Sequence, residues 1–427
     1  YGRGSWAPSL RYHNEMFYVS TFSSTSGKTH IFTTTDPENE PWKEISFSPS
    51  LHDNTLVFED DGRVYMIWGA GRLSIVELEP DLSGIKEETR QVLIENASAP
   101  AGDNIMLPAE GSQLLKVNGM YYIFNITWVQ DDMRQVVVHR ADNLFGPYEG
   151  RLILRDRGIA QGGIVDSPDG EWYGLFFRDF GSVGRIPYLM PASWNEGWPV
   201  LGIDGKVPDT LDLPASVGLM PGIVASDDFD RRENDPDLPL VWQWNHNPVN
   251  DLWSVSERPG YMRLRTGKTV DELQQARNTL TQRTFGPVSA AYTLVETGNM
   301  KEGDYAGLCA LQLKYGQVGV KVENGNKYIF MISNQTNTPT EIETVPLSQS
   351  EVYLKVECDY RDRADKARFF YSLDGVNWIQ IGNELNMQYT LMEHFMGYRF
   401  GLFNYATQSA GGYADFDFFR VSDTISW

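Results

Sequence analysis

Four chemically distinctive residues occur at similar places in the first half of the sequence. Trp6, Asp53, Glu110 and Gln161 each stand just ahead of a short strand-like segment. Two carboxyl groups can exchange protons with a substrate, an indole ring packs on an apolar face, and an amide both donates and accepts hydrogen bonds. If the four positions meet, they predict a shallow funnel suited to acid–base chemistry.

A repeat in the first half of the sequence predicts that these four residues lie close together in the fold. A polar turn followed by an aromatic strand recurs four times, at 13–19, 61–67, 118–124 and 169–175. Asn-Gly and Asp-Gly turns join paired strands, and units of about 50 residues with four strands are typical of β-propeller blades. Because the innermost strand of each blade lines the central channel, residues ahead of those strands should gather at one end of the propeller axis.

The pattern changes after about residue 200. From residue 226 onward the chain consists of many strand-like segments without a repeat, which is typical of a jelly-roll, concanavalin-like β-sandwich. We therefore expect an all-β protein with a β-propeller domain over 1–215 and a β-sandwich domain over 226–427. Asp228 and Asp417, near the two ends of the sandwich, could meet on paired strands and hold a structural calcium ion, or could be two surface acids.

Composition limits the partners. The 427 residues include 36 Lys+Arg and 57 Asp+Glu, which gives a net charge of −21. This acid excess, without any basic run, argues against nucleic acid, an anionic membrane surface or a polyanionic substrate, and leaves a neutral oligosaccharide or polysaccharide open. No apolar run reaches the roughly 18 residues of a membrane span. Cys309 and Cys358 are expected to be buried thiols rather than a disulfide, and secreted, periplasmic and cytoplasmic locations all stay open.

Several short motifs, taken together, resemble glycoside hydrolase family 43. They are Ser5-Trp6-Ala7-Pro8, His52-Asp53-Asn54, Ala109-Glu110-Gly111-Ser112, Gln161-Gly162-Gly163 and Gly184-Arg185-Ile186-Pro187. The segment from about 226 to the end resembles the sandwich domain that follows the propeller in many β-xylosidase-like members. The resemblance implies a five-bladed propeller, of which four blades are visible here. It also implies removal of xylose and/or arabinofuranose units from xylan-type oligosaccharides, with inversion at the anomeric carbon.

The resemblance also implies roles for individual residues. Glu110 matches the general acid, and Asp53 matches the aspartate that orients the acid and favours its protonated form. Arg185 matches an arginine that binds sugar hydroxyls, and Trp6 matches a ring in the pocket wall. His52, beside Asp53, could hydrogen-bond within the site.

Three further residues are weaker candidates for substrate binding. Trp68 could line the sugar pocket or belong to the core. Gln161 stands where many family members have a histidine near a channel calcium, and an amide is a weaker metal ligand than imidazole. Phe395 falls where family sandwich domains place an aromatic side chain over the pocket, which would limit action to chain ends or side branches; a core phenylalanine is an equally good interpretation.

The general base has no candidate in this sequence. In the family it lies on the innermost strand of a blade that precedes the Trp6-Ala7-Pro8 stretch, so an upstream segment or a separate chain is expected to complete the propeller. Hydrolysis by two carboxyl groups requires no cofactor. The alternative hypothesis, from another class, is a carbohydrate-binding or scaffold protein with a degenerate, inactive propeller.

Overall fold

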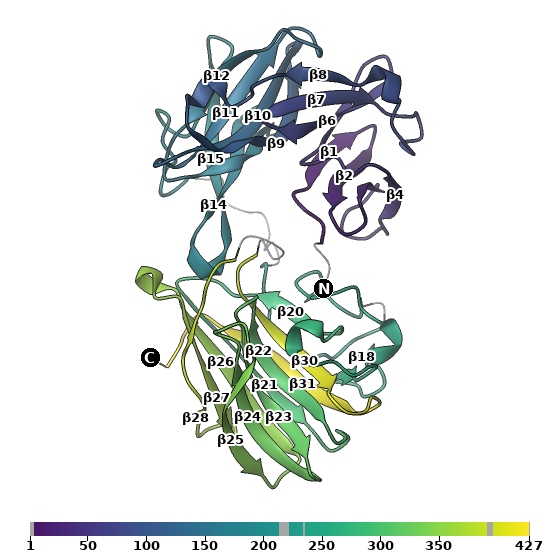
Figure 1. Cartoon of the computed structure of the whole chain (residues 1–427), viewed down its shortest axis with the longest axis vertical. Helices are drawn as coiled ribbons and strands as arrows, with labels where there is room; N and C mark the ends of the chain where they lie inside the picture. Colours follow the sequence, from purple (N-terminus) through teal and green to yellow (C-terminus); the bar gives the residue numbers. More distant parts are fainter. Residues whose placement is uncertain (1–3, 213–221, 234, 391–395, 427) are drawn as a thin grey trace. The chain divides into compact units, whose positions relative to one another are not determined.

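The computed structural model describes residues 4–212, 222–233, 235–390 and 396–426. Nearly all regular structure is β-strand, which confirms the all-β prediction (Figure 1). The helices of the described residues are single 3₁₀ turns: η1 (Glu87–Thr89), η2 (Ala99–Ala101), η3 (Gly181–Val183), η4 (Asn250–Leu252), η5 (Leu273–Gln275) and η6 (Arg361–Arg363). None of these helices is long and apolar enough to cross a lipid bilayer.

The chain divides into two compact units. The propeller unit comprises Gly2–Asp179 and Arg185–Ala215, and the sandwich unit comprises Phe180–Gly184 and Ser216–Trp427. The short segment Phe180–Gly184 therefore groups with the sandwich, although it interrupts the propeller in sequence.

The described part of the propeller unit holds four antiparallel sheets of four strands each, in the order of the sequence. The first sheet contains β1 (Ser9–His13), β2 (Met16–Ser23), β3 (Lys28–Thr34) and β4 (Lys43–Phe47). The second contains β5 (Thr55–Phe58), β6 (Val64–Ala70), β7 (Arg72–Glu77) and β8 (Gln91–Ile94). The third contains β9 (Ile105–Val117), β10 (Met120–Val129), β11 (Arg134–Ala141) and β12 (Glu149–Leu154), and the fourth β13 (Ala160–Asp166), β14 (Trp172–Asp179), β15 (Arg185–Asn195) and β16 (Trp198–Leu201).

The turn chemistry read from the sequence accounts for the first hairpin of each sheet. Asn118 and Gly119 both have positive φ, as a two-residue hairpin turn requires, and Met120 pairs with Val117 directly after them. In the first sheet Asn14 and Glu15 adopt the same left-handed conformation between β1 and β2. The four predicted repeats are therefore four blades.

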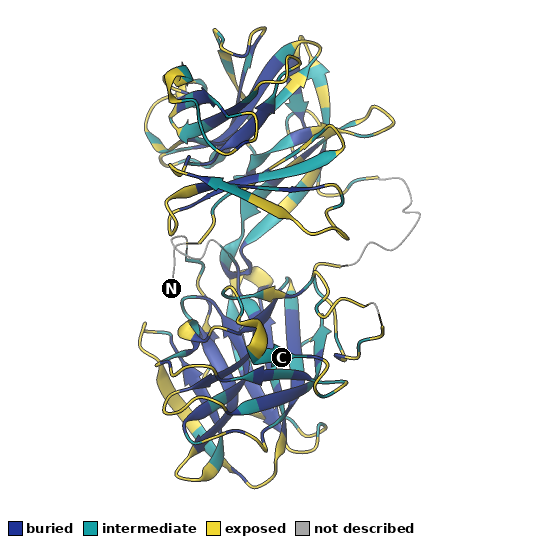
Figure 2. Ribbon diagram, turned by 90° about the vertical axis from the view of Figure 1, so that its right-hand side faces the viewer, coloured by how far each residue is buried: buried dark blue, intermediate teal, exposed yellow. Residues whose placement is uncertain are grey.

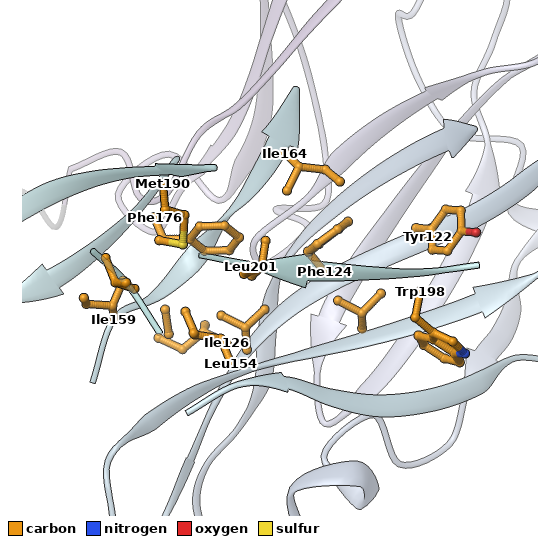
Figure 3. Close-up of a cluster of buried hydrophobic side chains, with 14 residues drawn as sticks. Tyr122, Phe124, Ile126, Leu154, Ile159, Ile164, Phe176, Met190, Trp198 and Leu201 are labelled. Atoms are coloured by element: carbon orange, nitrogen blue, oxygen red, sulfur yellow. The ribbon is translucent and has the colours of Figure 1, made fainter. Parts of the chain in front are cut away.

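Apolar side chains between successive sheets form three cores. One lies between the first and second sheets and includes Ile31 and Met66. Another, with Ile67 and Ile123, lies between the second and third sheets. A core between the third and fourth sheets contains Phe124, whose ring centroid lies 6.5 Å from that of Phe176 (Figure 3). Alternation along each strand explains this arrangement, because both faces of a middle sheet must be apolar.

Within the described residues, the first and fourth sheets each expose large apolar side chains on one face. Leu10 and Tyr12 are 58% and 62% exposed, while the alternate residue Arg11 points the other way and donates to the carbonyl of Leu56 in the second sheet. In the fourth sheet, Val165 and Leu175 are 60% and 55% exposed. Two uncovered apolar sheet faces indicate surfaces that another element would cover.

The sandwich unit contains two antiparallel sheets. The order of the seven-stranded sheet is β17 (Gln243–Trp244), β20 (Leu280–Arg283), β30 (Arg399–Ala406), β22 (Asp304–Leu311), β23 (Gly316–Glu323), β24 (Asn326–Ser333) and β25 (Thr340–Leu347). The order of the eight-stranded sheet is β18 (Trp253–Ser254), β19 (Met262–Arg265), β31 (Tyr413–Ser422), β21 (Val288–Glu296), β26 (Glu351–Asp359), β27 (Lys366–Ser372) and β28 (Ile379–Gln380), with β29 (Leu385–Asn386) also paired to β27.

Burial is heaviest in the strands of the sandwich (Figure 2). Phe400 and Leu402 of one sheet and Phe416 and Phe419 of the other are fully buried. Cys309 and Cys358 are both buried, free thiols, as predicted.

Candidate active site

The two carboxyl groups expected at the site lie side by side in the structure. One oxygen each of Asp53 and Glu110 and one ring nitrogen of His52 lie within 4.8 Å of one another. Glu110 Oε2 is 2.9 Å from His52 Nε2, and Asp53 Oδ2 is 3.7 Å from the same nitrogen. His52 therefore contacts both acids and fixes the orientation of Glu110.

Backbone conformation explains how successive sheets present these side chains. Asp53, Gly111 and Gln161 all have left-handed φ values, of 47°, 66° and 54°. The pairing register of β9 is broken at Gly111, and that of β13 is broken at Gln161. Such irregularities redirect a strand and commonly occur beside active sites.

The register of the repeat differs by one residue from the sequence interpretation. Ser9 Oγ hydrogen-bonds to both Thr55 Oγ1 and Gln113 Oε1, so Thr55 and Gln113 occupy equivalent places on their inner strands. Counting back two residues from each makes Asp53 equivalent to Gly111 rather than to Glu110. Glu110 instead takes the position of His52 in the preceding sheet.

Asp53 is buried, with 5% of its side chain exposed. Burial raises its pKa to about 6, and the charge of Glu110 acts in the same direction. His52, a hydrogen bond from the backbone N–H of Gly111 and the charge of Arg185 oppose this rise. Asp53 therefore loses its proton at a pH where an exposed aspartate is already ionised.

The charge on His52 depends on its acidic neighbours. Burial alone would lower the pKa of His52, but the hydrogen bond to Glu110 and the charges of Asp53 and Glu110 outweigh it and raise this pKa. A protonated imidazole between two carboxyl groups can donate to either of them.

Arg185 is held in place by an acid and a ring. Its Nε donates to Asp179 Oδ1 at 3.2 Å, and its guanidinium lies 4.4 Å from the ring centroid of Phe177. Asp179 also forms an ion pair with Arg134. Because the charge of Arg185 acts on Asp53, this arginine belongs to the same electrostatic environment as the two acids.

Two other predicted residues lie at the edge of this group. The Trp6 ring packs against Phe22 at 5.4 Å and meets the His52 ring edge-on at 6.0 Å. The Gln161 side chain passes so close to Gly111 that a Cβ atom at position 111 would lie 2.6 Å from its Nε2. Only glycine at position 111 allows this contact.

One candidate for the pocket wall, Trp68, packs elsewhere. Trp68 packs against the core between the first and second sheets, with Arg90 over its ring at 5.2 Å. Phe395 lies outside the described residues.

Sequence reasoning missed several partners of the site. Asp179 and Phe177 position Arg185, yet neither belongs to the motifs identified in the sequence. A half-buried arginine requires a counter-ion, but sequence spacing does not indicate which acid supplies it.

Within the described residues, histidine, cysteine and acidic side chains converge closely enough to hold a metal ion at one place, which is the His52–Asp53–Glu110 group. The pair suggested for calcium has other interactions. Asp228 forms an ion pair with Arg420. Burial raises the pKa of Asp417, and the charges of Asp228 and Asp230 add to this effect.

Both halves of the chain match models of known protein families. Residues 1–199 match the model of glycosyl hydrolases family 43, and residues 226–422 match that of the beta xylosidase C-terminal concanavalin A-like domain. The "Putative beta-xylosidase" of Xylanibacter ruminicola is 31% identical over 409 residues, which cover 91% of this chain and 72% of that protein.

Two solved structures show the same architecture. A bifunctional GH43-CE protein of Bacteroides eggerthii is 60% identical with a TM-score of 0.95, and the match covers 100% of this chain and 55% of that one. This chain therefore spans about half the length of that protein. A GH43 glycoside hydrolase engineered to display both endo-xylanase and exo-arabinofuranosidase activity is 26% identical with a TM-score of 0.84, covering 98% of this chain and 85% of that one.

Proposed function

Since the chain belongs to glycosyl hydrolases family 43, we propose that its propeller removes xylose and/or arabinofuranose units from xylan-type oligosaccharides by inverting acid–base hydrolysis. The observation that carries this proposal is the convergence of Asp53 and Glu110, from two successive sheets, to within 4.8 Å beside His52. In this assignment residues 1–215 form the catalytic domain and residues 226–427 an accessory sandwich.

Glu110 is the general acid of the proposed reaction. Its carboxyl group protonates the oxygen of the departing sugar, which makes that oxygen a better leaving group. Asp53 is a positioning residue: it lies beside the acid, and its Oδ2 is 3.7 Å from the same His52 nitrogen that contacts Glu110. His52 holds Glu110 in place through the 2.9 Å contact.

The side chains around these two acids bind the sugar in the proposed reaction. The guanidinium of Arg185, oriented by Asp179 and Phe177, carries N–H donors of the kind that bind sugar hydroxyls. The ring of Trp6 supplies an apolar surface for a sugar face. Gln161 can donate to and accept from hydroxyls at the same end of the sheets.

A fifth sheet is proposed to supply the general base. Inversion needs a second carboxylate about 6.5–9.5 Å from the acid, with a water molecule between them. The exposed Leu10 and Tyr12 on the first sheet, and Val165 and Leu175 on the fourth, are apolar surfaces that such a sheet would cover. An upstream segment or a separate chain would provide it.

The test compares this chain with a version that includes the upstream segment. The longer protein should release xylose from an aryl xyloside, arabinose from an aryl arabinofuranoside, or both. Proton NMR should show the anomer of opposite configuration as the first product. The 427-residue chain alone should be at least about 100-fold slower, because the base is absent. Retention of configuration would refute inversion, and inactivity of the longer protein on every such glycoside would favour a binding or scaffold role.

A structural calcium at Asp228 and Asp417 also remains a proposal. Oxygen ligands suit calcium, and the mutual repulsion of Asp417, Asp228 and Asp230 would be relieved by a cation. Arg420 already neutralises part of this charge. Calcium at 100 times its dissociation constant should stabilise the sandwich by about 2.7 kcal/mol. The melting temperature should therefore fall on chelation, and a double variant Asp228→Asn/Asp417→Asn should not respond; an unchanged wild-type melting temperature would exclude the site.

A further inference from the structure

The sandwich unit contains a pocket distant in sequence from the acidic site. Its volume is about 210 Å³, and it lies between the segment that follows β19 and the strand β30. Clefts for drug-sized ligands are usually about 300–1,000 Å³, so this pocket suits something smaller, of the size of one sugar ring. Leu252, Val270 and Ala276 provide apolar walls.

Three cationic side chains line this pocket, although the whole chain has a net charge of −21. Arg265 forms an ion pair with Glu257, which lies outside the lining. Lys268 and Arg277 are exposed. Arg277 Nη1 donates to the carbonyl of Asn247 at 3.2 Å, and within the described residues neither side chain forms an ion pair with a carboxylate. The pocket therefore keeps positive charge available for an anionic group.

A buried acceptor in the same lining lacks a donor. Asn404 is 6% exposed, and its Nδ2 donates to the carbonyl of Leu264 at 2.7 Å. Its Oδ1 is buried and has no hydrogen-bond partner within the described structure. A buried acceptor without a donor is unfavourable, and a ligand hydroxyl that reached this oxygen would satisfy it.

The neighbouring amide in the lining is different. Asn278 accepts from the backbone N–H of Val249 at 3.0 Å and donates to the carbonyl of the same residue at 2.9 Å. These two bonds fix the segment that carries Val249 and Leu252 against the pocket. Of the two buried amides in the lining, Asn404 is therefore the one with an unpaired oxygen.

From this combination we propose that the sandwich pocket binds a carboxylated sugar unit, such as a hexuronic acid. The carboxylate would lie between Lys268 and Arg277, a hydroxyl would donate to Asn404 Oδ1, and the ring would contact Leu252 and Val270. A neutral sugar would leave the charges of Lys268 and Arg277 without a counter-charge, and a small inorganic anion would make no contact with the apolar walls. That this unit belongs to a branch of the substrate polymer rests on the proposed function.

Binding is tested on the whole chain, without any measurement of hydrolysis, by calorimetric titration with D-glucuronic acid. Its methyl ester, D-xylose and inorganic phosphate are the comparison ligands. Glucuronic acid should bind about tenfold or more tightly than each of them. Equal affinity for the ester or xylose would refute the role of the carboxylate charge. Equal affinity for phosphate would refute the proposal that the ligand is a sugar.

The matched variants remove two charges in each case. Lys268→Gln/Arg277→Gln should weaken the binding of glucuronic acid about tenfold or more, whereas Lys43→Gln/Arg232→Gln, which changes exposed side chains elsewhere, should not. Neither double variant should alter cleavage of an aryl xyloside by the protein that includes the proposed fifth sheet. Unchanged binding in the pocket variant would refute the site, and this outcome is independent of whether the propeller proves to be a xylosidase.

Discussion

Glu110→Gln is expected to slow the hydrolysis of unactivated xylo- or arabino-oligosaccharides by about 10²–10⁴-fold, the usual contribution of a positioned general acid. Glutamine keeps the shape of the side chain and can still accept from His52 Nε2, which lies 2.9 Å from Glu110 Oε2. It has no proton to give to the departing oxygen. The loss should therefore be confined to the step that needs the acid.

Substrates with different leaving groups distinguish a general acid from a residue that only maintains the structure. Aryl glycosides with a strongly acidic phenol depart without protonation, so Glu110→Gln should affect them little. The assays use the propeller together with the proposed fifth sheet, and Glu171→Gln, at an exposed residue beside the first hairpin turn of the fourth sheet, provides the matched control. An equal fall in rate on activated and unactivated substrates would count against Glu110 as the acid.

Asp53→Asn is expected to lower activity by about 10²–10³-fold and to stabilise the fold at neutral pH. Burial raises the pKa of Asp53 to about 6 from the ordinary 3.8. Between these two values the unfolded chain ionises while the folded chain keeps the proton. The free energy of unfolding therefore falls as pH rises from about 4 to about 6, by up to about 3 kcal/mol. Asparagine removes this loss and can still accept from the Gly111 N–H.

Denaturation with urea at pH 4 and pH 7.5 measures the effect. Asp53→Asn should exceed the wild type in stability at pH 7.5 and lose most of that advantage at pH 4. Asp169→Asn, in an exposed turn, should show no such difference. In the completed enzyme, the acidic limb of the pH–rate profile near pH 6 should also disappear from the variant. Equal stability of Asp53→Asn and wild type at pH 7.5 would mean that the burial of Asp53 has no energetic consequence.

The strands and their order in the propeller could be predicted because local signals and global fold agree. A polar turn followed by an aromatic strand recurs in each sheet, as at Asn118-Gly119, so the first hairpin of each sheet could be predicted from the sequence. The expected proximity of Asp53 and Glu110 followed from that repeat. In the sandwich the strands were also identifiable from their apolar residues, but their pairing was not, since β19 pairs with β31 about 150 residues later.

The finer details of the site could not be read in the same way. The one-residue offset between Asp53 and Glu110 arises from a left-handed residue and a pairing irregularity, and both depend on contacts between sheets. The partnership of Arg185 with Asp179 depends on a hairpin that brings two strand ends together. The pocket of the sandwich combines Arg277 with Asn404, which no local motif connects.

In the described part of the propeller unit, the cores between successive sheets form a linear array with two ends. In such an array each terminal repeat is stabilised by one neighbour instead of two, so fraying should begin at the first and fourth sheets. An element seated on both end faces would turn the line into a ring. Opening any one sheet would then require breaking two interfaces at once, and the whole unit would melt more cooperatively.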